Sequence, residues 1–218
     1  MANQPLPKVT LKDAAYHHIK QKILSCEMLP GQPIYEKQLS EELGSGRTPV
    51  REALLTLKNE GLVNIFPHKG MCVAPITEAA ITEVHQLRKL LEPTVCAQYK
   101  NVLSKSTLLD YEHRFKTLDV HNDRAYYALD IEFHQYLISI AGNATLDRFF
   151  QGLMQVQYRL GMYSTLRQKV DKAHYCQKHA DIISAILSEQ DEEIVNKLTD
   201  HINESLLIAL RTLRQPET

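Results

Sequence analysis

The periodicity of apolar residues divides the chain into a short mixed part and a longer helical part. From Glu78 onward, apolar residues recur at intervals of three or four positions, which is the spacing of an amphipathic helix. Breaks between the helical segments coincide with capping or turn-forming residues such as Ser104 and Gly142. The pattern predicts helices over residues 78–101, 105–121, 123–141, 144–168, 172–188 and 191–213.

Short helices and short β-like segments alternate in the first part of the chain. Gly44 and Gly61 follow two of the helical segments, where glycine commonly ends a helix. Thr48 is a suitable N-cap for the third helix, with Pro49 in its first helical position. The predicted elements are a helix over 10–26, a strand at 34–35, a helix over 36–43, a helix from Thr48 to the stop at Gly61, and a hairpin of strands 62–66 and 71–75.

A short segment that contains Pro75 separates these two patterns. We therefore predict two domains, residues 1–76 and residues 77–218, in this chain of 218 residues. The predicted fold class is mainly α, with three helices and a hairpin in the first domain and an all-helical antiparallel bundle in the second.

Composition excludes some classes of protein without identifying one. Apolar residues make up 44% of the chain, yet no segment approaches the roughly 18 apolar residues of a membrane span. The N-terminus lacks the apolar region of a secretory signal peptide, and the four cysteines form no CxxC pair. These features predict a cytoplasmic protein with reduced thiols and no membrane association. The net charge of −1 gives no hint of nucleic acid.

The order of elements in residues 10–75 is that of a winged helix-turn-helix: helix, short helix, tight turn, helix and hairpin. The third helix of such a domain enters the major groove of DNA with its N-terminal residues. Here those residues are Arg47, Thr48 and Arg51. Arginine suits the position because its planar fork can hold guanine or phosphate with two hydrogen bonds.

The predicted hairpin tip adds two further candidates for DNA contact. His68 and Lys69 lie there and could reach a flanking groove or the phosphate backbone. The alternative interpretation of the third helix is a solvated amphipathic helix whose arginines pair with Glu42 or Glu52. The whole set of residues, in this order, favours DNA binding.

A long match to one family covers this part of the chain. The segment PGQPIYEKQLSEELGSGRTPVREALLTLKNEGLVNIFPHKGMCV resembles the DNA-binding domain of the GntR family of bacterial transcription regulators. Two positions depart from its pattern, because Ser45 and Gly46 replace the usual Val-Ser, and Gly46 removes a hydroxyl that could bond a phosphate. The resemblance implies that the DNA-contacting residues are Arg47, Thr48 and Arg51 in the helix and His68, Lys69 and Gly70 in the wing.

Polar side chains fall on the apolar faces of several predicted helices in the second domain. Asp130 and His134 are four residues apart on one such face, so both should point into the bundle. His179 and His201 occupy the apolar faces of the last two helices. Each lies eleven residues from the break between those helices. In an antiparallel hairpin both imidazoles therefore sit at one level, about 16 Å from the turn.

Burial of these groups without partners costs several kcal/mol, and a divalent cation offsets that cost by binding them. One carboxylate and three neutral imidazoles suit Zn²⁺, Ni²⁺, Cu²⁺ or Fe²⁺, and this donor set does not choose sharply among them. The alternative is a hydrogen-bonded polar cluster that holds no metal.

A second resemblance covers residues 78–213, which are similar to the FCD domain, the helical effector domain of the FadR subfamily. Its pattern of D…FH, then H..I..AI, then a final histidine is met by Asp130, His134, His179 and His201. The resemblance implies that these four residues bind a metal, often Zn²⁺ or Ni²⁺, beside a pocket for a small molecule.

Arg88 matches a recurring arginine of the same family. The resemblance makes it a candidate clamp for an effector carboxylate, which arginine binds with two hydrogen bonds. The alternative for Arg88 is a salt bridge with Glu92, Glu83 or Glu132.

The two resemblances together imply a homodimeric transcription regulator that reads a double-stranded DNA operator and responds to a small organic acid. A metal-sensing regulator, in which the ion itself is the signal, stays open as an alternative. A metallohydrolase is a remote alternative, because the sequence has no HExxH motif and no inward glutamate placed as an obvious general base. We therefore expect no enzymatic activity.

Overall fold

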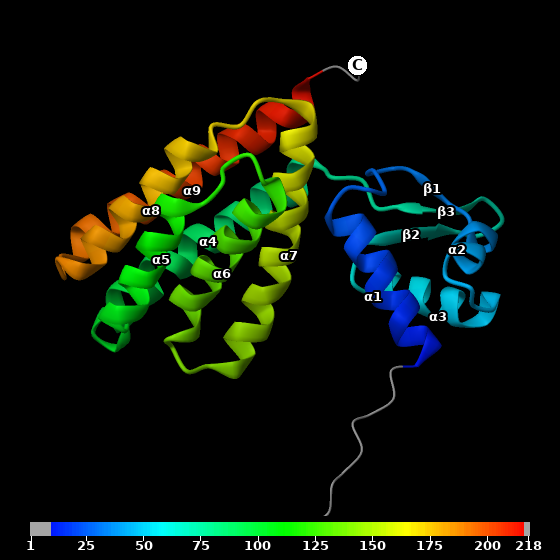
Figure 1. The fold of residues 1–218 in the computed structure, drawn as a ribbon, viewed down its shortest axis with the longest axis horizontal. Helices are drawn as coiled ribbons and strands as arrows, with labels where there is room; N and C mark the ends of the chain where they lie inside the picture. Colours follow the sequence, from blue (N-terminus) through cyan, green and yellow to red (C-terminus); the bar gives the residue numbers. More distant parts are fainter. Residues whose placement is uncertain (1–9, 216–218) are drawn as a thin grey trace, which may run out of the picture. The chain divides into compact units, whose positions relative to one another are not determined.

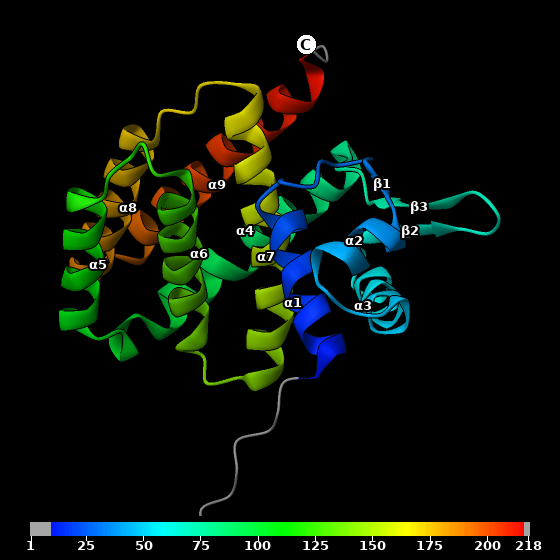
Figure 2. The ribbon, with the colours of Figure 1, turned by 45° about the vertical axis from the view of Figure 1, so that its right-hand side comes forward.

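A small sheet and three helices make up the first of two units in the computed structural model, which describes residues 10–215. The division between the units falls between Pro75 and Ile76. Figures 1 and 2 show the hairpin of this unit beside its helices. Its elements are α1 (Leu11–Leu24), β1 (Pro33–Ile34), α2 (Glu36–Glu42), α3 (Arg47–Asn59), β2 (Val63–Phe66) and β3 (Gly70–Val73).

The three strands form an antiparallel sheet in the order β1-β3-β2. In the hairpin, Val63 pairs with Val73 and Phe66 pairs with Gly70. Gly70 adopts a φ of +97°, a backbone conformation that glycine reaches without a clash at Cβ. Gly70 thus supplies the left-handed angle that the sequence predicts for glycine in this hairpin, and His68 adopts a second one, with φ of +61°.

The start of α3 differs from the prediction. Gly46 occupies the N-cap position and Arg47 is the first helical residue, so the predicted cap at Thr48 was wrong. Pro49 is accommodated in the third helical position because the first N–H groups of a helix have no partner within it. The earlier start places Arg47 and Thr48 in the first turn, where free backbone N–H groups can also bind phosphate.

Apolar side chains at helical spacing form the core of the first unit between α1, α3 and the sheet. Ile19, Ile23, Leu54 and Leu57 are fully buried. Leu55 is 45% exposed although it adjoins Leu54, because one residue advances about 100° around a helix.

Leu54→Ala should lower the free energy of unfolding of the first unit by about 2–5 kcal/mol, because it removes buried methyl groups and leaves a cavity. Leu55→Ala is the matched control on the same helix and should change stability by less than about 1 kcal/mol. Urea denaturation followed by circular dichroism measures both. Equal losses in the two variants would contradict this assignment of the core.

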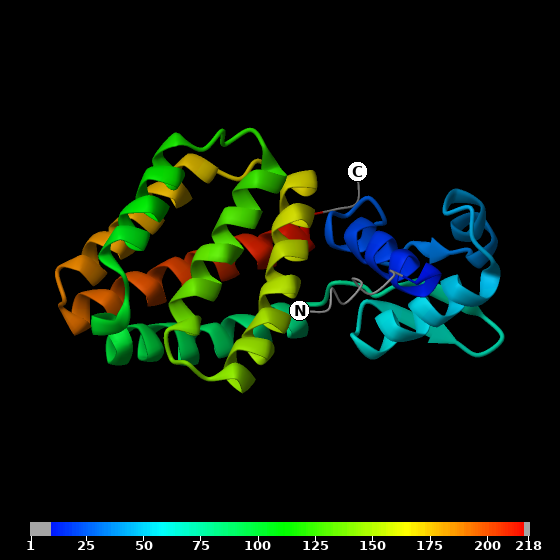
Figure 3. The ribbon, with the colours of Figure 1, turned by 60° about the horizontal axis from the view of Figure 1, so that its bottom comes forward.

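The second unit consists of helices throughout its described residues. Figures 1 and 3 show α4 and α9 running along each other, with α6 beside α7. The predicted mainly α fold, with an all-helical second domain, is confirmed. Between residues 10 and 215, no helix is both long and apolar enough to cross a membrane. The elements are α4 (Glu78–Tyr99), a short 3-10 helix (Lys100–Val102), α5 (Lys105–Thr117), α6 (Asp123–Ser139), α7 (Ala144–Arg167), α8 (Lys172–Leu187) and α9 (Asp191–Arg214).

Helix α5 is shorter than the sequence pattern predicts, since it ends at Thr117 and the prediction ran to residue 121. Leu118 has an extended backbone with ψ of 135°. Asn122 then caps α6, because its side chain accepts a hydrogen bond from the N–H of Ala125. The extended backbone at Leu118 therefore separates the end of α5 from the cap of α6.

Candidate metal centre and DNA-contacting surface

Four buried side chains from three helices converge at one point in the second unit. Asp130 and His134 project from α6, His179 from α8 and His201 from α9. One ligand atom from each lies within 4.8 Å of the others. The rings of His179 and His201 are 4.5 Å apart, as their equal distance from the break between α8 and α9 predicts. The structure thus brings together all four residues selected from the sequence.

The distances among the ligand atoms fit a single metal ion. The Nε2 atom of His134 is 3.1 Å from Nε2 of His201 and 3.3 Å from Nε2 of His179. Asp130 Oδ1 is 3.0 Å from Nε2 of His179. Two ligands bound tetrahedrally at about 2.0–2.1 Å from Zn²⁺ lie about 3.3 Å apart. These three pairs are therefore spaced as ligands of one divalent ion are, and a fourth pair, His134 Nε2 and Asp130 Oδ1, is 3.7 Å apart.

The protonation states at this cluster also suit a metal. Burial acts to raise the pKa of the Asp130 carboxyl, but its hydrogen bond from His179 and the adjacent histidines lower it to about 2. Burial lowers the pKa of His179, and it lowers the pKa of His201 well below the ordinary value. At neutral pH the site therefore offers the ionised Asp130 carboxylate and the neutral imidazoles of His179 and His201, which are the forms that bind metal ions.

Glu92 on α4 is a functional candidate that the sequence analysis missed. Its Oε2 accepts a hydrogen bond of 2.6 Å from Nδ1 of His134, and its Oε1 accepts one of 2.6 Å from Nε of Arg88. Burial acts to raise the pKa of Glu92, but Arg88 and His134 lower it to about 2. The contact holds His134 as the Nδ1–H tautomer and aims its Nε2 lone pair at the cluster, as carboxylates do behind metal-bound histidines.

The contacts of Glu92 and Arg88 bear on two expectations from the sequence. The sequence has no inward glutamate placed as an obvious general base, and although Glu92 is fully buried, its two oxygens are bound by Arg88 and His134, which leaves it poorly suited to that role. Of the alternatives for Arg88, the ion pair with Glu92 forms. The Nη1 and Nη2 atoms of Arg88 have no hydrogen-bond partner among the described residues, so they could still meet an anionic ligand.

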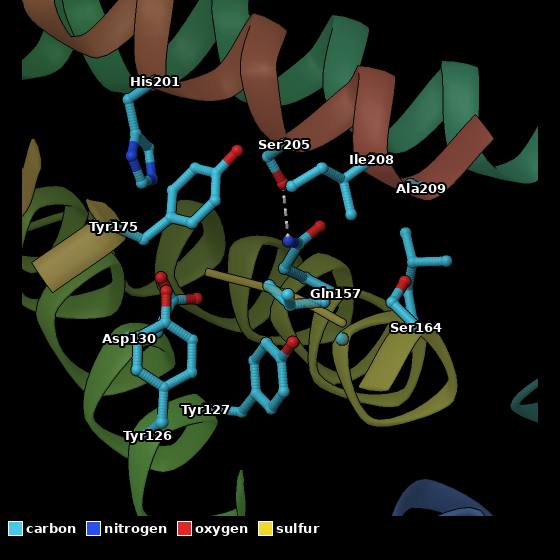
Figure 4. A pocket seen from close by; sticks show the side chains of 13 residues that line it. Tyr126, Tyr127, Asp130, Gln157, Ser164, Tyr175, His201, Ser205, Ile208 and Ala209 are labelled. Carbon is cyan, nitrogen blue, oxygen red and sulfur yellow. Dashed lines mark hydrogen bonds between the residues drawn. The ribbon is translucent and has the colours of Figure 1, made fainter. Parts of the chain in front are cut away.

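A cavity of about 40 Å³ borders two of the four ligands, Asp130 and His201. Figure 4 shows these two residues at one end of it and Ser164 and Ile208 at the other. Its polar wall groups, besides the two ligands, are those of Tyr126, Tyr127, Gln157, Ser164, Tyr175 and Ser205. Sequence reasoning did not find these residues, because they come from α6, α7, α8 and α9 and show no local motif.

The residues proposed for DNA contact are exposed in the first unit. The side chain of Arg51 is 73% exposed, and its Nε lies 3.8 Å from Glu36 Oε1, which is a weak contact. A surface groove between α3 and the hairpin is lined by Arg51, Leu55, Phe66 and His68, among others. The exposed residues are Arg47, Thr48, Arg51, His68, Lys69 and Gly70. Of these candidates, Arg51 from α3 and His68 and Gly70 from the hairpin line this groove.

An exposed winged helix-turn-helix together with a helical domain that gathers metal ligands defines a class of bacterial DNA-binding regulators. Residues 11–73 match the family model "Bacterial regulatory proteins, gntR family", and residues 83–204 match the FCD domain. The chain belongs to the GntR family of bacterial transcription regulators and carries an FCD domain.

Known proteins resemble the chain over most of its length. It is 24% identical over 225 residues to the HTH-type transcriptional repressor RspR of Escherichia coli K12, a match that covers 96% of this chain and 92% of RspR. The structure of E. coli McbR/YncC is similar with a TM-score of 0.77 and 18% identity, covering 94% of this chain and all of that one. The Zn²⁺-bound FCD domain of TM0439 covers 65% of this chain and 99% of that one, with a TM-score of 0.52 and 17% identity.

The metal-free protein should lose stability as the pH falls below about 6.5, the ordinary pKa of histidine. His85, His179 and His201 all have lowered pKa values in the fold, so the unfolded chain takes up protons first and acid favours unfolding. For His85, whose pKa is about 4, the loss is complete near pH 4 and amounts to about 3 kcal/mol.

Urea unfolding at several pH values between 7.5 and 4, in the presence of a chelator, measures this loss. His85→Asn removes one of the titrating groups and should flatten the profile between pH 6.5 and 4. A wild-type profile that stays flat through this window would contradict the burial of neutral histidines.

Proposed function

We propose that this regulator is a member of the FadR subfamily that binds operator DNA as a homodimer and responds to a small carboxylate effector bound beside a divalent metal ion. The convergence of four buried ligand atoms within 4.8 Å, in the same chain as an exposed winged helix, carries the proposal. A two-fold dimer would read a pseudo-palindromic operator, as helix-turn-helix dimers generally do.

The metal ligands in this proposal are Asp130, His134, His179 and His201, and the metal is Zn²⁺ or Ni²⁺. Three imidazoles and one carboxylate match the N/O donor preference of both ions. The Zn²⁺-bound form of the TM0439 FCD domain supports the assignment by structural similarity. When bound, the ion would supply a Lewis-acid site for a carboxylate, while Glu92 keeps the His134 ring oriented.

The cavity beside the ligands favours an effector over the ion as the signal. It reaches Asp130 and His201, so a molecule inside it could also contact the metal. Arg88 does not line this cavity and is fully buried. Its two Nη atoms have no partner among the described residues, so Arg88 would bind an effector carboxylate only if ligand binding opened a path to them. The effector would regulate DNA binding by binding one arrangement of the dimer more tightly than another.

DNA binding in this proposal depends on the first turn of α3 and on the wing, through Arg47, Thr48, Arg51, His68, Lys69 and Gly70. All six residues are exposed; Arg51, His68 and Gly70 line the groove between α3 and the hairpin, and Arg47 and Arg51 line a second hollow beside α2. Arginine and lysine supply phosphate contacts, and the arginine fork can also read guanine.

Arg51→Ala should weaken binding to DNA from upstream of the protein's own gene by at least about tenfold, because it removes a charged contact at the groove. Lys58→Ala, at the opposite end of α3, is the matched control and should bind within about twofold of the wild type. Fluorescence anisotropy at fixed salt measures both. If Arg51→Ala binds like Lys58→Ala, α3 does not enter the groove by its N-terminus.

Glu92→Gln should weaken Zn²⁺ affinity by about 10–100-fold, because a neutral amide holds the His134 ring less firmly and no longer raises its basicity. Glu83→Gln, on the exposed face of the same helix, should leave the affinity unchanged. Competition with a fluorescent chelator measures affinity, and circular dichroism checks the fold.

The double variant His134→Ala/His179→Ala removes two of the four proposed ligands and should lose all bound metal. Undiminished bound metal in that variant would contradict the proposed site.

A further inference from the structure

Gln157 on α7 presents a buried hydrogen-bond acceptor that the fold leaves unused. The side chain lines the cavity beside the candidate metal centre and is only 7% exposed. Its Nε2 donates to Ser205 Oγ at 3.1 Å, whereas its Oε1 is buried without a partner among the described residues. Figure 4 shows the amide nitrogen turned toward Ser205 and the oxygen on the side away from His201.

The orientation of this amide follows from a histidine two hydrogen bonds away. His85 Nδ1 lies 2.7 Å from the backbone oxygen of Ile81, which can only accept, so Nδ1 carries the proton. Burial lowers the pKa of His85 to about 4, so the ring is neutral at pH 7. Its Nε2, at 3.2 Å from Ser205 Oγ, is therefore an acceptor.

Ser205 has one proton and must donate it to His85. The oxygen of Ser205 can then only accept from Gln157, so Gln157 must turn its NH₂ group toward Ser205. The three hydrogen bonds run in one direction, from Gln157 to Ser205 to His85 to Ile81. This direction leaves the Gln157 oxygen as a pure acceptor at the end of the chain.

We propose that Gln157 selects effectors whose end remote from the metal donates a hydrogen bond. The inference rests on the proposed function, in which a carboxylate group binds beside the metal. A cavity of about 40 Å³ admits only a small ligand. The ligand class is therefore a small acid of three or four carbons that carries a hydroxyl group at its far end.

Groups that cannot donate are disfavoured at this position for a physical reason. A methyl or fluoro group at the remote end of the effector would leave the buried Gln157 oxygen without a hydrogen bond. A carbonyl or carboxylate oxygen there has no proton to donate, so its lone pairs would repel those of the Gln157 oxygen. The amide cannot turn to relieve this, because turning would set its oxygen against the Ser205 oxygen. Sites built to bind a hydroxyl discriminate strongly against analogues that lack it.

Isothermal titration calorimetry on the full-length Zn²⁺-loaded protein tests the inference with three acids of equal size. The probes are 2,3-dihydroxypropanoate, 2-hydroxybutanoate and 3-fluoro-2-hydroxypropanoate, which differ only in a terminal hydroxyl, methyl or fluorine. The wild type should bind the dihydroxy acid at least about tenfold more tightly than either analogue. In Gln157→Met, the three affinities should fall within about twofold of one another.

Two further variants serve as a control and as a second test of the role of Gln157. Gln177→Met, the same change at an exposed position of α8, should retain the wild-type preference. Ser205→Ala frees the Gln157 amide to turn and should cut the preference to about threefold or less, which provides a second test if Gln157→Met fails to fold. Bound metal and circular dichroism establish that each variant is intact.

Each remaining outcome overturns a stated claim. Equal binding of the three acids by the wild type, or a preference that survives Gln157→Met, would overturn the role of Gln157 while leaving the metal-linked carboxylate site standing. If none of the acids binds the Zn²⁺-loaded wild type, the proposed carboxylate site fails, and the inference about Gln157 fails with it.

Discussion

Burial of charged groups inside a helical bundle is the constraint on which the second unit depends. Arg88 and Glu92 are fully buried, and Asp130 is 5% exposed. An unpaired charge in such a place costs several kcal/mol, so each needs a partner. The partners come from α4, α6, α8 and α9, so the packing of these helices and the pairing of their charges form one requirement. Removing one of these charged side chains leaves its partner buried without a hydrogen bond, and that partner then carries the full free-energy cost of desolvation.

Periodicity alone located the four metal-ligand candidates. Asp130 and His134 are one helical turn apart, and a polar pair on an apolar face has few explanations other than a shared buried partner. The equal spacing of His179 and His201 from the interhelical break then predicted their proximity, and their ring centroids lie 4.5 Å apart. Such geometry can be read from sequence because helix rise and helix pairing are regular.

Other features were not predictable, for definite physical reasons. An arginine and a glutamate four residues apart are as typical of a solvated helix face as of a core, so Glu92 gave no distinct signal. The contacts of Ser205 with His85 and Gln157 span 120 and 48 residues and depend on tertiary packing. The cap at Thr48 was misassigned because glycine also serves as an N-cap and proline is tolerated throughout the first turn.

In the proposed function, Asp130, His134, His179 and His201 bind one divalent metal ion together. X-ray absorption spectroscopy at the zinc edge, on full-length protein loaded with one equivalent and dialysed, tests it most directly. Three imidazole nitrogens and carboxylate oxygen should surround the zinc at about 2.0–2.1 Å, with no sulfur. Sulfur scattering at about 2.3 Å, or an ion that is lost on dialysis, would contradict it.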